Sequence, residues 1–200
     1  YDNSALYSGI EVGSKGVKMS LLEVGKNAKN NGSFNVLKDT SINTDFISFS
    51  SPTFQATLAG LCDLYEVASK QYSIESGKIF TVISSGVQMQ AQKDQKSDWI
   101  NRLIDSFRLK IKDPQRKVEV IDAMQEARLS HLGIVPDTRR FSTFLIDIGS
   151  GNTKGGYFNS NKIFVPVTFP LGTKSFQRLV EGKTQGDLNE FLKTAENILS

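Results

Sequence analysis

The sequence has 200 residues, of which 38% are hydrophobic, enough for one large domain or two small ones with a core each. No apolar run approaches the roughly 18 residues that span a bilayer, and a net charge of +3 is too small to indicate nucleic-acid binding, although it suits an anionic ligand. With one cysteine, Cys62, and one histidine, His131, the composition excludes an intramolecular disulfide and gives no support to a zinc site.

Three strands and a long helix open the chain. Two mostly apolar runs, residues 6–12 and 17–24, flank a short Gly-Ser-Lys-Gly segment and predict a hairpin, and residues 34–42 predict a third strand. Ser51 and Pro52 are typical of a helix start. Apolar residues then recur at helical spacing: Phe54, Leu58, Leu61, Tyr65, Ala68 and Tyr72.

Strands and helices alternate in the rest of the first half. The predicted elements are a buried strand at residues 78–84, a helix marked by Trp99, Leu103 and Phe107, a short strand at 118–121 and a helix at 123–132. The resulting order, βββαβαβα, is typical of a mixed sheet with helices on its faces.

A polar segment at residues 136–140 separates the two halves, and we predict domains at 1–137 and 138–200. The second half repeats the strand meander and then adds helices. Its predicted elements are strands at 142–148, 153–158 and 162–169 and amphipathic helices near 175–180 and 188–199.

An internal repeat links the two halves. The segment Glu11-Val12-Gly13-Ser14-Lys15-Gly16-Val17-Lys18 aligns with Asp147-Ile148-Gly149-Ser150-Gly151-Asn152-Thr153-Lys154. Both copies lie where one apolar strand turns into the next, so the order acid, aliphatic, Gly, Ser, two variable residues, β-branched, Lys indicates duplicated lobes. Two hairpin turns of this kind are expected to face one cleft.

These residue types suit phosphate binding at a strand turn. Glycine lets successive backbone N–H groups point at an anion, and hydroxyl groups add further donors. Lys15, Lys18 and Lys154 are candidates to offset phosphate charge, whereas the acids, Glu11 and Asp147, could hold Mg²⁺. One such turn alone would be interpreted as an ordinary β-turn, but two matched copies favour a phosphate clamp. Neither copy is a P-loop.

Several segments, in this order, resemble the exopolyphosphatase and guanosine pentaphosphate phosphohydrolase (Ppx/GppA) family of the actin, sugar kinase and Hsp70 superfamily. They are Gly9 to Ser14, Ser84-Ser85-Gly86, Gln125-Glu126-Ala127-Arg128-Leu129, Ile146 to Thr153, and Phe169-Pro170-Leu171-Gly172. The resemblance implies an α/β fold made of actin-like ATPase (ribonuclease H-like) lobes, with a mixed five-stranded sheet flanked by helices. It also implies that the second lobe is partial here, because the family continues beyond this point.

The resemblance also assigns roles. Glu126 matches the family's general base for the attacking water, and Asp147 matches its acid at the second turn, so both are candidate catalytic residues. Glu11 and Asp147 are candidate Mg²⁺ ligands. The candidate phosphate-binding residues are Gly13, Ser14, Lys15, Gly149, Ser150, Gly151, Asn152 and Thr153. By residue type alone, a solvent-facing helix position is the favoured interpretation of Glu126, and the order of the family's segments reverses that preference.

Four positions depart from the family pattern. Glu11 stands where the family has Asp, Lys15 where it has Asn, and Gln88 where it tends to have Arg. Lys154 replaces an acid, which changes the local charge by two units. If Lys154 points into the cleft, it favours capture of anions and opposes recruitment of a metal; if it lies on the outer face of its strand, it has neither effect.

Two functions therefore stay open at this point. The first is Mg²⁺-dependent hydrolysis of a phosphoanhydride in polyphosphate or guanosine pentaphosphate, and the expected ligands are polyphosphate and guanosine penta- or tetraphosphate. The second is a catalytically impaired relative that binds polyphosphate, a nucleotide or a protein partner; a kinase or ATPase of the same superfamily is a third reading. We expect no nucleic-acid or membrane partner and allow for a homodimer. The chain is expected to be cytoplasmic or the mature form of an exported protein.

Overall fold

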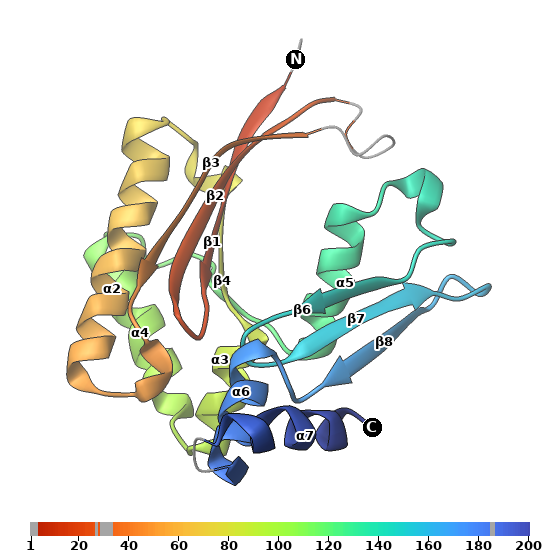
Figure 1. Ribbon diagram of the computed structural model, residues 1–200. Helices are drawn as coiled ribbons and strands as arrows, with labels where there is room; N and C mark the ends of the chain where they lie inside the picture. The colour runs from red at the N-terminus through yellow and green to blue at the C-terminus, as the bar shows by residue number, and fades with distance from the viewer. Residues whose placement is uncertain (1–3, 27, 29–33, 185–186) are drawn as a thin grey trace.

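Two separate sheets organise the chain. The computed structural model describes residues 4–26, 28, 34–184 and 187–200 (Figure 1). The first sheet has the strand order β3-β2-β1-β4-β5. Its strands are β1 (Ala5–Val12), β2 (Gly16–Val24), β3 (Phe34–Asn43), β4 (Ile79–Ile83) and β5 (Glu119–Val120). Strand β1 pairs antiparallel with β2 and parallel with β4, so the predicted mixed sheet is confirmed.

One face of the first sheet is covered by helices, and the other is open. Helix α2 (Ser51–Glu66), which continues into a π-helical turn (Val67–Gln71), and helix α4 (Ser97–Lys110) pack on the covered face (Figure 1). Alternate residues of β1 show this directly, because Ile10 and Val12 are buried in the core while Glu11, between them, faces the other way. The first acid of the repeat therefore lies on the open face.

Two details of this half differ from the prediction. Helix α2 begins one residue earlier than predicted, since Ser50 is the N-cap and exchanges hydrogen bonds with Thr53. Helix α3 (Ser85–Lys93) was missed altogether. Its buried residues, Ser85, Val87 and Ala91, are too small to give a helical pattern of large apolar side chains. Short 3₁₀ turns occur at Phe46–Ser48, Ser76–Lys78 and Asp137–Arg139.

The second sheet is an antiparallel meander. Its strands are β6 (Leu145–Ile148), β7 (Thr153–Phe158) and β8 (Phe164–Phe169), followed by helices α6 (Thr173–Thr184) and α7 (Leu188–Leu199). Helix α5 (Ala123–Ile134), which we placed with the first half, packs on β7 and β8. His131 anchors it there: its buried ring contacts Phe158 and Phe164, and its Nε2 lies 3.0 Å from the carbonyl oxygen of Thr143. The domain boundary at residue 137 stays a prediction.

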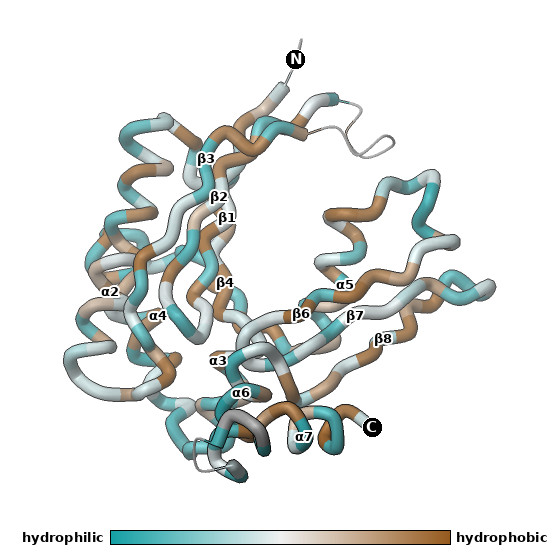
Figure 2. The backbone as a smooth tube through the Cα atoms, in the orientation of Figure 1, coloured by the Kyte–Doolittle hydropathy of each residue, from teal (hydrophilic) through white to brown (hydrophobic). Residues whose placement is uncertain are grey.

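The face of the second sheet turned away from α5 is apolar and exposed. Large side chains on this face are 40–65% exposed: Phe144, Ile146, Ile148, Tyr157 and Phe169. Figure 2 shows the hydrophobic residues of β6 and β8. None of the helices described is both long and apolar enough to cross a membrane.

Candidate phosphate-binding cleft

The two copies of the repeat form hairpins with the same register. Glu11 pairs with Lys18 across β1 and β2, and Asp147 pairs with Lys154 across β6 and β7. Each four-residue turn is closed by a backbone hydrogen bond, which Gly13 N donates to Gly16 O (2.8 Å) and Gly149 N donates to Asn152 O (3.0 Å). The repeated acid and lysine are therefore cross-strand partners in both halves.

The tips of the two hairpins meet beside the start of α3. A Cβ atom built on Gly151 would lie 3.6 Å from Ser14 Oγ, and one built on Gly86 would lie 3.0 Å from the same atom. Both turns line one cavity of about 520 Å³, which we call the inner cleft. Glu11, Glu126 and Asp147 line it too, so the prediction that the two acids of the repeat share one cleft is confirmed.

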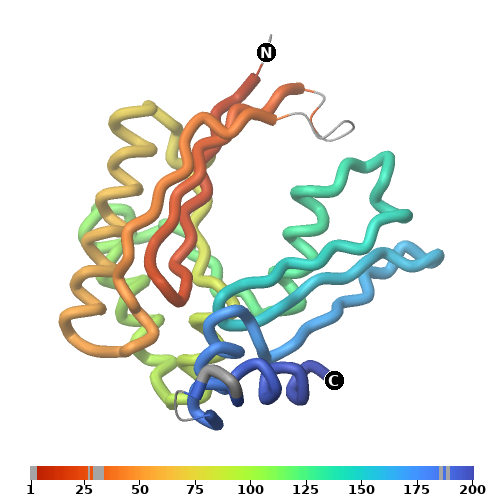
Figure 3. The backbone as a smooth tube through the Cα atoms, in the orientation of Figure 1, coloured from red at the N-terminus to blue at the C-terminus, as the bar shows by residue number. Residues whose placement is uncertain are grey.

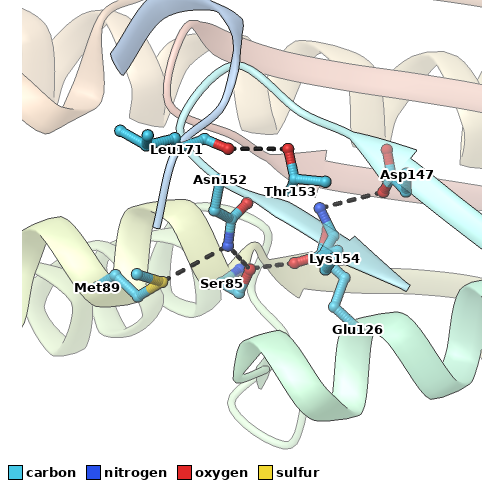
Figure 4. A network of polar contacts seen from close by, with 8 residues as sticks. All are labelled: Ser85, Met89, Glu126, Asp147, Asn152, Thr153, Lys154 and Leu171. Carbon is cyan, nitrogen blue, oxygen red and sulfur yellow. Dashed lines mark hydrogen bonds and ion pairs between the residues drawn. The ribbon is translucent and has the colours of Figure 1, made fainter. Parts of the chain in front are cut away.

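Lys154 lies between two acidic residues, Glu126 and Asp147 (Figure 4). Its side chain lies on the face of β7 opposite the exposed Tyr157 and points toward α5. Asp147, its partner on β6, points the same way. Helix α5 starts at a capping box made by Asp122 and Gln125, which sets Glu126 in its first turn. The Nζ of Lys154 lies 3.0 Å from Glu126 Oε1 and 3.1 Å from Asp147 Oδ2, and the side chain is only 5% exposed.

A chain of hydrogen bonds extends from this ion pair to α3. The backbone N–H of Ser85 donates to Glu126 Oε2 at 2.9 Å. The Ser85 hydroxyl accepts from the buried Asn152 amide at 3.1 Å, and the same amide lies 3.5 Å from Met89 Sδ (Figure 4). Elements from both sheets thus meet at Ser85. Neither Ser85 nor the start of α3 was predicted as part of the site, except through the resemblance of the Ser84-Ser85-Gly86 segment.

The segment after β8 holds the second turn in place through hydrogen bonds. Thr173 N donates to Gly149 O, and the Ser175 hydroxyl donates to Gly151 O. Thr153, which we predicted to donate to phosphate, instead donates its hydroxyl to Leu171 O at 2.8 Å and does not line the inner cleft. Because β7 alternates, the side chains of Thr153 and Lys154 lie on opposite faces, and only Lys154 reaches the cleft.

All the other predicted phosphate-binding residues lie at the inner cleft. The seven that line it are Gly13, Ser14, Lys15, Gly149, Ser150, Gly151 and Asn152, and their role in phosphate binding stays a prediction. Gln88, the position that departs from the family's Arg, does not line it. Cys62 lies far along α2, where partial burial raises the pKa of its thiol, and His131 belongs to the packing of α5.

The charges of the inner cleft balance. Three carboxylates line it, Glu11, Glu126 and Asp147, and so do three lysines, Lys15, Lys18 and Lys154. Burial acts to lower the pKa of Lys154, but the hydrogen bond and charge of Glu126, followed by those of Asp147, raise it above its usual value. Lys154 is therefore a permanent cation at neutral pH, and its stabilising contribution is lost only as the pH rises through that raised pKa.

Glu11, unlike Lys154, destabilises the fold when it is charged. Burial raises the pKa of its carboxyl group, Lys18 opposes this, and Glu126 reinforces it. Because the folded pKa lies above the unfolded one, ionised Glu11 destabilises the fold at high pH, and this cost vanishes when the pH falls below about 4.5.

We predict that Glu11→Gln raises Tm by a few degrees near pH 8 and has little effect near pH 4. Thermal unfolding across this pH range, with Glu196→Gln as an exposed control, measures the two shifts; equal shifts at both pH values contradict the prediction.

The residues present do not fit the Mg²⁺ that the resemblance implies. An ammonium group already bridges Asp147 and Glu126 at hydrogen-bond distance. Within the described part of the chain, no group of three or more His, Cys, Asp or Glu side chains is placed to hold a metal ion. A divalent cation between these carboxylates would have to displace Lys154 against direct charge repulsion.

Two α/β units that present matching hairpin turns to a shared cleft define a protein of the actin-like ATPase fold. No protein-family model matches the sequence, and no curated protein matches it either. Among solved structures, the chain is similar to the Aquifex aeolicus member of the Ppx/GppA family, with a TM-score of 0.64 and 14% identity over 90% of this chain. A second structure, of the Aquifex aeolicus PPX-GPPA enzyme, gives a TM-score of 0.65 and 17% identity over 98% of this chain.

An exopolyphosphatase from Cytophaga hutchinsonii is also similar, with a TM-score of 0.57, 16% identity and coverage of 89% of this chain and 53% of that one. The fold implied by the resemblance is therefore confirmed. The chain spans about three fifths of the Aquifex aeolicus proteins, 61% and 62% of their lengths.

Proposed function

We propose that this protein binds chains of linked phosphate groups in the inner cleft without a divalent cation, and that it hydrolyses them slowly or not at all. The observation that carries the proposal is the position of Lys154 Nζ, 3.0 Å from Glu126 and 3.1 Å from Asp147. A lysine built into the site supplies a positive charge where the Ppx/GppA resemblance implies a metal.

Charge explains why the cation matters. With Lys154, three acids and three lysines line the inner cleft, and the net charge is zero. An acid at this position, as in the family pattern, would make the net charge −2, which is the charge that one divalent cation neutralises. The substitution and the metal are thus electrostatically equivalent, and a phosphate chain can enter this cleft without added Mg²⁺.

The same contacts argue against fast hydrolysis. A general base has to accept a proton from the attacking water. The Oε1 of Glu126 already accepts from Lys154, and its Oε2 accepts from the Ser85 N–H. A water molecule must compete with both donors for the remaining lone pairs.

A second function, slow phosphoanhydride hydrolysis with Glu126 as base, is favoured by one observation: the Glu126 carboxylate lines the cleft together with both turns. Release of phosphate from polyphosphate and from guanosine pentaphosphate separates the two functions. Turnover that Glu126→Gln abolishes, with binding retained, would establish the hydrolase. No turnover in either form supports the binding protein.

Titration calorimetry with polyphosphate, in EDTA and in Mg²⁺, tests the binding proposal. We expect the affinity of the unaltered protein to change by less than about threefold between the two conditions. Lys154→Glu should weaken binding in EDTA by at least about tenfold, because each unit of charge at ~6 Å and a dielectric of ~20 interacts by roughly 3 kcal/mol before screening. Added Mg²⁺ should then recover part of the loss.

Lys18→Glu is the matched control, since it makes the same change of charge at the equivalent position of the first hairpin, on an exposed side chain. Screening by water should make its effect smaller, with no dependence on Mg²⁺. An unaltered protein that binds polyphosphate only in Mg²⁺ contradicts the proposal.

A further inference from the structure

Uncharged residues make up one whole face of the second sheet, the face turned away from α5, which we call the outer face. Strand alternation and cross-strand register assign nine residues to it: Phe144, Ile146, Ile148, Thr153, Gly155, Tyr157, Val165, Val167 and Phe169. Figure 3 shows α5 along the other side of these strands, where it packs on β7 and β8. The outer face is therefore one continuous surface without a charged group.

The internal repeat shows that the equivalent face of the first sheet lies in the hydrophobic core. In the alignment of the two copies, Val12 matches Ile148, and Ile10, two residues earlier, matches Ile146. Ile10 and Val12 are 1% and 0% exposed, on the face that α2 and α4 cover, whereas Ile146 and Ile148 are 60% and 65% exposed. An apolar face that is buried in one half and exposed in the other is expected to be an interaction surface.

The exposed area of the outer face is large enough for a specific contact. Five of its large side chains are 40–65% exposed: Phe144, Ile146, Ile148, Tyr157 and Phe169. A large side chain offers roughly 200 Å² when fully exposed, so together the five expose about 500 Å². Two copies packed face to face would bury about 1,000 Å², which is the lower limit for a specific protein–protein interface.

A second copy of the same chain suits this face. Around a two-fold axis, each outer face packs against an identical one, so apolar residues meet apolar residues and no charge is buried. Sheets that pack in this way lie about 10 Å apart with their strands at about 30°, and their side chains interdigitate. A partner with an acidic or basic surface would instead have to bury charges against a face that offers none in return.

We infer that two copies of this chain form a dimer through their outer faces. Asp147 and Lys154 lie on the opposite face of the second sheet, so both inner clefts stay accessible in the dimer. The dimer therefore forms whether or not phosphate is bound, and the inference does not rest on the proposed function. An apolar interface of about 1,000 Å² is expected to have a Kd in the micromolar range.

Sedimentation equilibrium over about 1–200 μM protein tests the dimer. We expect the mean mass to rise from that of one copy to that of two, in about 0.1 M and about 1 M NaCl alike, because salt does not screen apolar contacts. Ile146→Glu should weaken the dimer by at least about a hundredfold, since it buries a carboxylate without a partner. Phe169→Glu makes a similar change on β8, at the other edge of the sheet, and should act as strongly.

Ile134→Glu is the matched control. Ile134 is 62% exposed, close to the 60% of Ile146, and lies at the end of α5, on the other side of the second sheet. The substitution should change the affinity of the dimer by less than about twofold. Far-UV circular dichroism checks that each variant keeps its fold, and where one of the two face variants does not fold, the other decides the test.

Each other result overturns the inference. A mean mass that stays at one copy at every concentration would leave the outer face to a different partner. A mean mass that grows beyond two copies would show open-ended association in place of a closed pair. Loss of the dimer in Ile146→Glu but not in a folded Phe169→Glu would place the contact at the β6 edge of the sheet. An equal effect of Ile134→Glu would reduce the loss to a general effect of charge.

Discussion

Lys154→Met should lower the free energy of unfolding by about 3 kcal/mol, near the low end of the range for breaking a buried ion pair, because Asp147 keeps partial contact with solvent. The substitution preserves the length of the side chain and removes its charge. Glu126 then retains only the Ser85 N–H as a partner, and three carboxylates line the cleft with no buried cation between them. Urea unfolding at neutral pH measures the loss.

Lys18→Met is the control for this prediction, because it removes the equivalent lysine from an exposed position, and it should cost less than about 1 kcal/mol. Lys154→Ala tests whether the loss of stability comes from the unpaired carboxylates, because it removes the charge of the lysine and also leaves room for a metal ion between them. Mg²⁺ should raise the Tm of the alanine variant and leave that of the unaltered protein unchanged. A methionine variant as stable as the unaltered protein would show that the ion pair contributes nothing to folding.

Gly172→Ala should destabilise the fold by about 2–3 kcal/mol and weaken polyphosphate binding by at least about tenfold. A Cβ atom at this position would lie 2.4 Å from Gly149 O and 2.7 Å from Asn152 N, distances that backbone atoms can relieve only if the second turn moves. That turn supplies four candidate phosphate-binding residues, so its displacement changes the inner cleft directly. Urea unfolding and calorimetry measure the two effects.

Gly182→Ala provides the control, because nothing lies within 4 Å of a Cβ atom built there and the residue is inside α6. Alanine should stabilise this helix by about 0.5–1 kcal/mol and leave binding unchanged. If Gly172→Ala behaves like Gly182→Ala, the segment after β8 does not position the second turn.

The sequence predicted the hairpins well because strand alternation and turn residues are local signals. Glu11 and Lys18 are seven residues apart around a four-residue turn, so their pairing follows from the hairpin alone, and the same holds for Asp147 and Lys154. The shared cleft followed from the repeat of this pattern.

What the sequence could not predict depends on packing between distant elements. Alternation places Asp147 and Lys154 on one face of the second sheet but does not say which face α5 covers. The ion pair of Lys154 with Glu126, 28 positions earlier, therefore needed the structure, as did the packing of α5 on the second sheet. Helix α3 was missed because small residues make its buried side.

The chain of contacts from Lys154 through Glu126 to Ser85 joins the second sheet to the first. A phosphate group that takes Lys154 as its partner competes with Glu126 for the same ammonium protons. Occupancy of the cleft and the strength of the connection between the sheets are therefore thermodynamically linked, and the linkage is reciprocal. Because α5 packs on the second sheet, Lys154 and Glu126 belong to the same half, and an anion that engages Lys154 leaves the Ser85 N–H as the donor that Glu126 retains.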